Sequence, residues 1–187
     1  MTTRPNPVDE RLSVEEFQSL PEEEGYRLEL SRGRIVREPA PGPRHGHLTG
    51  RLYRALAAFA EDEGLGLVFV DTAFVLSSAE GIVRAPDVAF VSSERVPPQG
   101  VTDRFWELAP DVAVEVVSPS NTVSAMQRKA LEYLDAGAPL VWIVDPAERT
   151  ATVHRGRDDI RILAEADALE GGEALPGFRL ALADLFG

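Results

Sequence analysis

A strand, a helix and a second strand follow one another closely between residues 111 and 144. Residues 111–117 form an apolar run interrupted by one acid, and Leu-Val-Trp-Ile-Val forms another run at 140–144. Between them, Asn121 is a suitable N-cap for a helix that ends at Gly137, since glycine is favoured just after a helix. Two strands joined through a helix pair in parallel, by a right-handed crossover. The segment therefore predicts an α/β fold, bordering on α+β, with a mixed sheet.

The rest of the chain supplies helices and hairpins around this crossover. Ser13 and Glu16 form a capping box that opens a short helix, which stops at Pro21. The remaining patterns predict a hairpin over 26–38, a helix over 45–63, β-rich runs at 67–76 and 83–91, a hairpin over 150–163 and a short terminal helix near Phe186. Because no repeat or linker interrupts these patterns, we expect a single domain over 13–187 and a flexible N-terminus over 1–12.

Composition limits the classes of function. The 187 residues include no cysteine, which excludes disulfides and thiolate metal sites and fits a cytoplasmic enzyme. We find no signal peptide and no apolar run of about 18 residues that could span a membrane. The net charge of −12 repels polyanions at long range. Any binding of nucleic acid must therefore depend on metal ions and on local arginines.

Two acids lie within otherwise apolar β-rich segments. Asp87 begins a strongly apolar run, and Glu115 is the only polar residue between Val112 and Val117. A carboxylate inside a buried strand is costly unless it is paired or binds a metal. Glu115 on a solvated strand face and Asp87 as a turn residue are the structural alternatives. If the two acids meet on adjacent strands, they suit Mg²⁺ or Mn²⁺, which prefer oxygen ligands.

The chain has 19 cationic side chains, and only Lys129 is a lysine. Lysine is a compact ammonium with a movable pKa, whereas arginine is a delocalised fork that stays charged. Lys129 shares one helical face with Met126 and Tyr133, so it borders the packed side of its helix. It can return to the acidic pair if this helix folds back across the sheet. Survival by drift on a solvated face is the alternative explanation.

Several motifs together resemble the Uma-two family, restriction-endonuclease-like proteins of the PD-(D/E)XK nuclease superfamily. They cover nearly the whole chain in order: Tyr-Arg-Leu-Glu29-Leu, His45, Ala-Pro-Asp87-Val, Val-Glu115-Val-Val-Ser-Pro, Lys129-x-x-x-Tyr133 and Val-Trp142-Ile-Val-Asp-Pro146. The resemblance implies a central mixed sheet flanked by helices, with β-hairpins near both termini. It also implies a divalent-metal site and cleavage of DNA phosphodiester bonds.

The resemblance assigns roles to individual positions. Asp87 matches the aspartate of the Pro-Asp motif, and Glu115 matches the first acid of the (D/E)-x-K motif; with the backbone carbonyl of Val116 they would bind the metal. The third position of that motif is Val117 here, and the family is expected to carry its lysine on the next helix, at Lys129. The helix also opens with Asn-Thr-Val-Ser, where relatives commonly have an acid.

Two further residues are weaker candidates. Glu29 matches an acid of the first core element and could complete the acidic shell or hold a metal-bound water. It also alternates with leucines, as a residue on a solvated strand face would. His45 could contact the phosphate or hold the segment around Glu29, although a polar residue at a helix end is the simpler interpretation.

These assignments predict a Mg²⁺- or Mn²⁺-dependent DNA endonuclease that binds DNA weakly and acts as a homo-oligomer, by default a dimer. In this scheme Lys129 positions and activates the attacking water. Two alternatives remain at this stage. The chain could be a non-catalytic scaffold that retains the fold, which its acidic charge favours. It could instead be a metal-dependent phosphoesterase that acts on a small substrate.

Overall fold

The computed structural model describes residues 11–187. Apart from two short strands, 168–170 and 179–181, that form an unpredicted pair before the terminal helix, its elements follow the predicted order. They are α1 (Val14–Gln18), β1 (Tyr26–Ser31), β2 (Arg34–Pro39), α2 (Pro43–Ala60), β3 (Gly66–Val70), β4 (Phe74–Ser77), β5 (Ile82–Arg84), β6 (Val88–Ser92), the 3₁₀-helix η1 (Ser93–Arg95), β7 (Val112–Val116), α3 (Val123–Asp135), β8 (Leu140–Asp145), β9 (Thr150–His154), β10 (Ile160–Leu163), β11 (Ala168–Glu170), β12 (Arg179–Ala181) and α4 (Leu182–Phe186).

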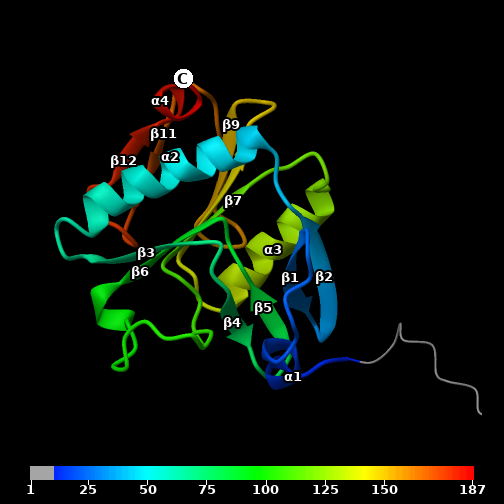
Figure 1. The fold of residues 1–187 in the computed structure, drawn as a ribbon. Helices are drawn as coiled ribbons and strands as arrows, with labels where there is room; N and C mark the ends of the chain where they lie inside the picture. The colour runs from blue at the N-terminus through cyan, green and yellow to red at the C-terminus, as the bar shows by residue number, and fades with distance from the viewer. Residues whose placement is uncertain (1–10) are drawn as a thin grey trace, which may run out of the picture.

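The centre of the molecule is a six-stranded mixed sheet with the strand order β10-β9-β8-β7-β6-β3. The strands β7 and β8 pair in parallel, from Val112 opposite Leu140 to Val116 opposite Val144. Their neighbours in this sheet pair antiparallel. The helix α3 connects the two parallel strands (Figure 1). The predicted strand–helix–strand unit and the mixed α/β sheet are therefore confirmed.

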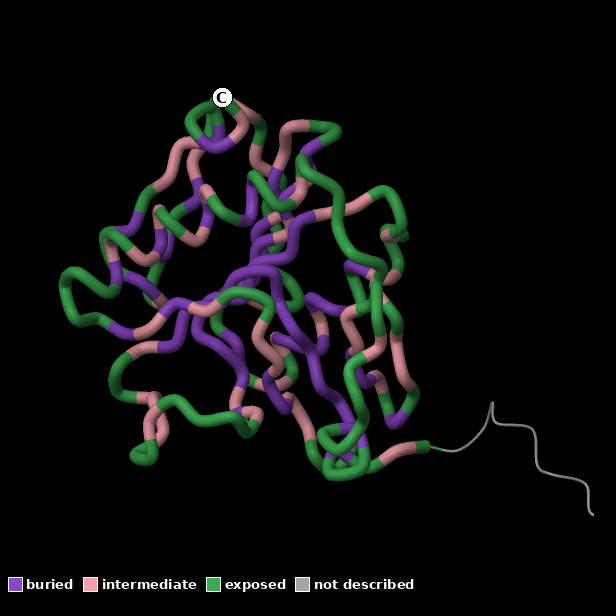
Figure 2. Tube along the Cα trace, viewed as in Figure 1, coloured by how far each residue is buried: buried purple, intermediate pink, exposed green. Residues whose placement is uncertain are grey.

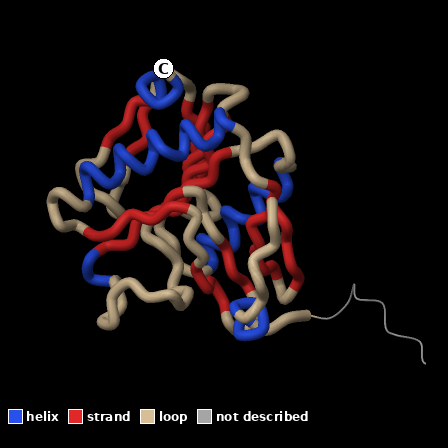
Figure 3. The backbone as a smooth tube through the Cα atoms, in the orientation of Figure 1, coloured by secondary structure: helices blue, strands red, loops and turns tan. Residues whose placement is uncertain are grey.

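Helices cover both faces of this sheet, as Figures 1 and 3 show. On one face, leucines of α2 and α4 and residues of the C-terminal segment pack against alternate positions of β6 to β9, among them Val114 and Trp142. On the other face, Ala130 and Tyr133 of α3 pack against Ala113 and Val141. The fully buried strands cross the middle of the molecule in Figure 2. No helix within residues 11–187 is both long and apolar enough to cross a membrane.

A second sheet, with the strand order β2-β1-β5-β4, lies beside the first and is covered by α1. Its hairpin between β1 and β2 turns through Arg32 and Gly33, which have φ angles of 52° and 77°. Two consecutive residues with positive φ form the tight turn whose twist suits a two-residue hairpin loop. This turn fixes the register of the two strands, from Ser31 opposite Arg34 to Tyr26 opposite Pro39.

The start of the domain differs slightly from the prediction. The backbone N–H of Leu12 donates to the carbonyl of Gly33 at 2.8 Å, so Leu12 is attached to the hairpin and is not part of a flexible terminus. Residues 1–10 of the predicted flexible segment lie outside the described residues. The capping box predicted at Ser13 and Glu16 is present.

Three predicted element boundaries were wrong. The run at 67–76 divides into β3 and β4 because Asp71 has a φ of 48°, a left-handed conformation that no strand adopts. The run at 83–91 divides into β5 and β6 at Pro86, which has no N–H to donate. The N-cap of α3 is Thr122, whose side chain accepts from the N–H of Ala125. The side chain of Asn121 instead accepts from the N–H of Ser118.

His154 is buried in β9, and neither of its ring nitrogens has a hydrogen-bond partner among residues 11–187. Burial lowers the pKa of His154 below its usual value, because the charged ring would lose its hydration. The unfolded chain therefore binds more protons than the folded one as the pH falls below about 6.5, and stability is lost in that range.

We expect His154→Leu to stabilise the protein by about 1 kcal/mol at pH 8, because the substitution removes buried polar atoms without partners. The gain should be larger at pH 5, where wild type also loses stability through protonation of His154. Urea unfolding of both proteins at the two pH values measures this difference. An equal gain at both pH values would show that His154 does not titrate differently in the folded and unfolded states.

Candidate active site

Asp87, the residue just before β6, lies beside Glu115 of the neighbouring strand β7. The antiparallel register places Val88 opposite Val114, so the next pair along is Asp87 with Glu115. Residues directly opposite each other project to the same face, with Cβ atoms about 4.5–5.5 Å apart. Asp87 is only 1% exposed and Glu115 only 2%. The structure thus brings together the two acids that the sequence singled out, and it buries both.

Hydrogen bonds hold the carboxylate of Asp87 from three sides. Its Oδ2 accepts the backbone N–H of Val116 at 2.6 Å and lies 3.1 Å from Nε2 of His45. Its Oδ1 accepts from Nη1 of Arg27 at 3.1 Å. These contacts lower the pKa of Asp87 and outweigh its burial, which acts to raise it. Because the N–H and C=O of one strand residue point to the same side, the carbonyl of Val116 also lies on the Asp87 side of β7.

His45 reaches Asp87 from the first turn of α2. Its second ring nitrogen, Nδ1, lies 3.4 Å from the hydroxyl of Thr49, one helical turn further along. Burial lowers the pKa of His45, but the hydrogen bond and the negative charge of Asp87 more than compensate and raise it. The structure places His45 against an acid of the site rather than against the Glu29 segment.

Glu115 receives two hydrogen bonds from α3. The hydroxyl of Tyr133 donates to its Oε1 at 2.9 Å, and Nζ of Lys129 donates to its Oε2 at 3.2 Å. Burial raises the pKa of Glu115 to about 7; Lys129 acts to lower it, whereas the charges of Asp87 and Glu29 add to the increase. Burial is therefore the main reason why this carboxyl group takes up a proton more readily than a free glutamate does.

Lys129 joins three carboxylates at once. Its Nζ lies 3.2 Å from both Glu29 and Glu115 and 2.6 Å from Glu38. Burial acts to lower the pKa of Lys129, but the surrounding carboxylates raise it well above its usual value. An ammonium has three N–H groups, so the three contacts account for its donors. The sole lysine of the chain is thus a buried cation and not a residue of a solvated face.

Glu29 lies deeper than the acids that face the cavity. Its Oε2 accepts from Arg84 at 2.7 Å, and its Oε1 accepts from the N–H of Ala85 at 3.0 Å and from Lys129. Arg84 in turn donates to Glu132 of α3 at 2.6 Å. Glu29 is fully buried and does not line the cavity described below. Its contacts support Lys129 and Arg84, and the acid that faces the cavity from this sheet is Glu38.

The sequence analysis missed Arg27 and Glu38, which form a cross-strand pair in the hairpin. Nη2 of Arg27 donates to Glu38 at 2.8 Å, and Nη1 donates to Asp71 at 2.5 Å as well as to Asp87. A signal was available. Once Arg32 and Gly33 are taken as a two-residue turn, counting back along both strands places Arg27 opposite Glu38.

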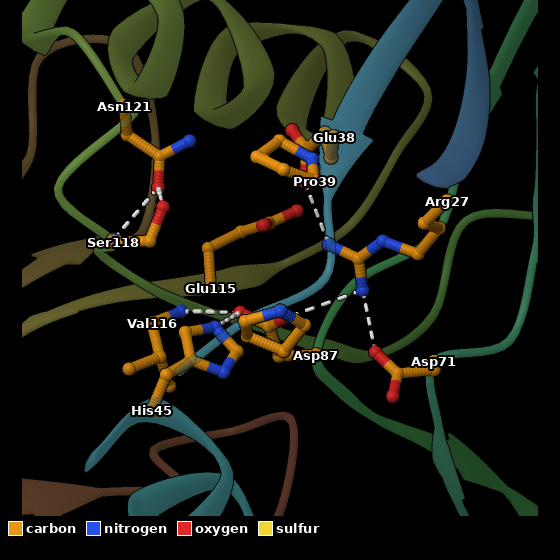
Figure 4. A pocket seen from close by; sticks show the side chains of 11 residues that line it. Arg27, Glu38, Pro39, His45, Asp71, Asp87, Glu115, Val116, Ser118 and Asn121 are labelled. Atoms are coloured by element: carbon orange, nitrogen blue, oxygen red, sulfur yellow. Dashed lines mark hydrogen bonds and ion pairs between the residues drawn. The ribbon is translucent and has the colours of Figure 1, made fainter. Parts of the chain in front are cut away.

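These residues surround a cavity of about 260 Å³, shown in Figure 4. Four acids contribute to its wall: Glu38, Asp71, Asp87 and Glu115. Ser118 and Asn121, just before α3, add a hydroxyl and an amide group on the side opposite Arg27 in Figure 4. The second sheet, the first turn of α2 and the end of the β6–β7 strand pair that carries Asp87 and Val116 therefore meet at one acidic opening.

Acidic side chains outnumber arginine and lysine side chains in the ion-pair network that surrounds the cavity and extends behind it. Six carboxylates are joined by three permanent cations in the network of Glu29, Glu38, Asp71, Asp87, Glu115, Glu132, Arg27, Arg84 and Lys129. Buried charge is costly unless it is compensated. Without a further cation, protonation is the remaining way to reduce the excess. The raised pKa of Glu115 is in keeping with this imbalance.

The oxygen atoms of the site fit a small divalent cation. Mg²⁺ is commonly held by one or two carboxylates and keeps several waters, and Asp87, Glu115 and the Val116 carbonyl would supply such a set. Within residues 11–187, no three histidine or acidic side chains form a ready-made ligand group. Glu38 and Asp71 pair with Arg27, and Glu38 also with Lys129, while the same two cations contact Asp87 and Glu115. The donor set thus suits a hydrated Mg²⁺ or Mn²⁺, not a fully protein-bound metal.

Comparisons with known proteins agree with this architecture. The sequence model of the Uma2 family, described as "Putative restriction endonuclease", matches residues 14–183. A crystal structure from Anabaena variabilis, described as "a putative nuclease belonging to DUF820", aligns with a TM-score of 0.84 at 22% identity. The alignment covers 94% of this chain and 97% of the other. The search of curated proteins finds no match. Because the family model spans almost all of the domain, the chain belongs to the Uma2 family.

Proposed function

We propose that this protein is a divalent-metal-dependent nuclease that hydrolyses DNA phosphodiester bonds. The observation that carries the proposal is the pair of buried carboxylates, Asp87 and Glu115, side by side at the wall of an open cavity. The descriptions of the matching family and of the similar crystal structure, a restriction endonuclease and a nuclease, support the same activity.

Asp87, Glu115 and the carbonyl of Val116 would hold Mg²⁺ or Mn²⁺. When bound, such an ion lowers the pKa of a coordinated water and stabilises negative charge on the phosphate. The chain itself fixes the two carboxylates. Asp87 is held by the Val116 N–H, Arg27 and His45, and Glu115 by Tyr133 and Lys129.

Lys129 would act mainly as a positioning residue. Its three short contacts with Glu29, Glu38 and Glu115 keep these carboxylates in place around the cavity. Direct contact between Lys129 and the attacking water, as the family resemblance implies, requires one of these contacts to open. Glu29 would act one layer further from the substrate, by fixing Lys129 and Arg84.

The charge of the chain limits how DNA can bind. At a net charge of −12, long-range attraction of DNA is absent. Arg27 and, when it is protonated, His45 line the cavity and carry the positive charge closest to Asp87. We therefore propose weak binding that depends on the divalent ion and falls as salt increases.

The proposal is tested by calorimetric titration of the wild-type protein with Mg²⁺ and Mn²⁺, together with plasmid nicking in the same buffers. We expect binding of one of these ions at millimolar concentrations or below, and nicking that requires that ion and stops with EDTA. Absence of metal binding at millimolar concentrations would contradict the proposal and would favour a non-catalytic scaffold.

A small phosphoester is the second candidate substrate, favoured by the acidic wall and modest volume of the cavity. A small ester avoids the repulsion that a polymer experiences. The same metal-loaded protein should therefore be assayed with bis(p-nitrophenyl) phosphate and with p-nitrophenyl phosphate. Turnover of a small ester without plasmid nicking would support the proposed metal site and would show that DNA is not the substrate.

A further inference from the structure

The strand β10 forms one edge of the central sheet and presents unused backbone groups. It pairs only with β9 in the described sheet, with Ile160 opposite His154 and Ile162 opposite Thr152. The N–H of Arg155 donates to the carbonyl of Asp159, so Asp159 directs its backbone groups toward β9. In an antiparallel ladder this direction alternates along the strand. The N–H and C=O groups of Ile160 and Ile162 therefore point away from the sheet.

The side chains of the same two residues are exposed. Ile160 is 45% exposed and Ile162 is 76% exposed, and both project to one face of the strand. Natural proteins usually protect such an edge with a very short strand, charged side chains, proline, a bulge or a covering segment. The strand β10 is short and carries Arg161, but between 159 and 163 there is no proline or lysine, and the ladder with β9 has no shift in register. A regular edge with exposed isoleucines is a template for pairing with another strand.

We propose that a second copy of this chain occupies this edge, with the two β10 strands antiparallel about a two-fold axis. Placing Ile160 opposite the partner's Ile160 sets Asp159 opposite the partner's Arg161, and the reverse by symmetry. Opposite charges in such positions stabilise a strand pair, whereas like charges destabilise it. Centring the axis on Arg161 would place two arginines against each other, and centring it on Ile162 would set Asp159 opposite the partner's Glu165. The charges therefore favour the register centred on Ile160.

The dimer is expected to be weak. In this register only residues 159–161 of each copy pair with one another, because positions 162 and 163 face the partner's bend at 157–158. So short a pair buries less than the roughly 800 Å² per partner of a stable interface. Self-association should therefore depend on concentration, with a dissociation constant on the order of 10 μM. The interface lies on β10, away from the residues that line the cavity, so the proposal stands or fails independently of nuclease activity.

Disulfide trapping tests both the edge and its register, because the natural chain has no cysteine. In the proposed register the two Cα atoms at position 160 are about 5.5 Å apart, within the range of a disulfide. We expect Ile160→Cys to give a covalent dimer rapidly under a mild thiol oxidant. The matched control is Val123→Cys, which places a thiol at an 87% exposed valine on α3. Equal crosslinking of the two variants would indicate random collision and would overturn the proposal.

Sedimentation velocity over concentrations of roughly 1 to 500 μM gives a second readout on the unmodified protein. Wild type is expected to shift from monomer to dimer. Ile160→Pro should remain a monomer, because proline removes the N–H that would donate to the partner's Ile160 and leaves the ladder with β9 intact. A monomeric wild type at all concentrations, or a proline variant that dimerises as wild type does, would exclude pairing through this edge.

Discussion

Replacing Lys129 by methionine is expected to lower the free energy of unfolding by about 3–5 kcal/mol at pH 7. The ammonium is 4% exposed and is shared by Glu29, Glu38 and Glu115. Without it, three carboxylates lose a common cation in a network that already has more acids than permanent cations. Because methionine has a side chain of similar length, the decrease in the free energy of unfolding measures the loss of the charge rather than a loss of packing. Urea unfolding, followed by circular dichroism, measures the difference.

The matched control is Arg128→Met, which removes one positive charge from an exposed position of the same helix. We expect little change in stability from this control. The effect of Lys129→Met should also shrink at pH 5. Carboxylates that have lost their cation have pKa values above those of the unfolded chain, so the penalty is lost as they take up protons. Equal destabilisation by the two variants would mean that the buried network does not depend on Lys129.

The central sheet could be predicted because its signals are local. The runs at 111–117 and 140–144, separated by a helix with a glycine stop, fixed the parallel pair without any tertiary information. The hairpins at 26–38 and 150–163 were predicted from alternation and turn residues. The division of each β-rich run into two strands that belong to different sheets could not be predicted from the sequence. It depends on the positive φ of Asp71 and on the chain path around Pro86, which tertiary packing imposes.

The residues of the candidate site likewise fall into those with a local sequence signal and those whose role depends on tertiary contacts. A carboxylate inside an apolar strand, as at Glu115, is conspicuous because burial makes it costly. A lone lysine is conspicuous by composition. Arg27 and Glu38 have neither signal, since arginine and glutamate alternating with apolar residues describe any half-exposed hairpin. Their importance arises only when the hairpin is placed against Asp87 and α3, a contact that no local pattern encodes.

Replacing Asp87 by asparagine is expected to reduce metal-dependent nicking by at least about 100-fold, because the site loses one of its two anionic ligands. Asparagine can still accept the backbone N–H of Val116, which keeps the β6–β7 end closed. Arg27 retains Glu38 and Asp71 as partners. The fold should therefore survive, and calorimetry should show that Mg²⁺ binding is lost together with nicking.

Asp71→Asn provides the matched control for this loss. Asp71 also lines the cavity and also binds Arg27, but its side chain is 56% exposed and lies beside neither Glu115 nor Val116. If the cavity merely needed negative charge, the two substitutions would weaken metal binding alike. If Asp87 is a metal ligand, only its replacement should abolish binding while the unfolding temperature stays close to that of wild type. Nicking by Asp87→Asn at the wild-type rate would show that Asp87 is not a metal ligand. It would also contradict the mechanism in which Asp87 and Glu115 bind the metal together.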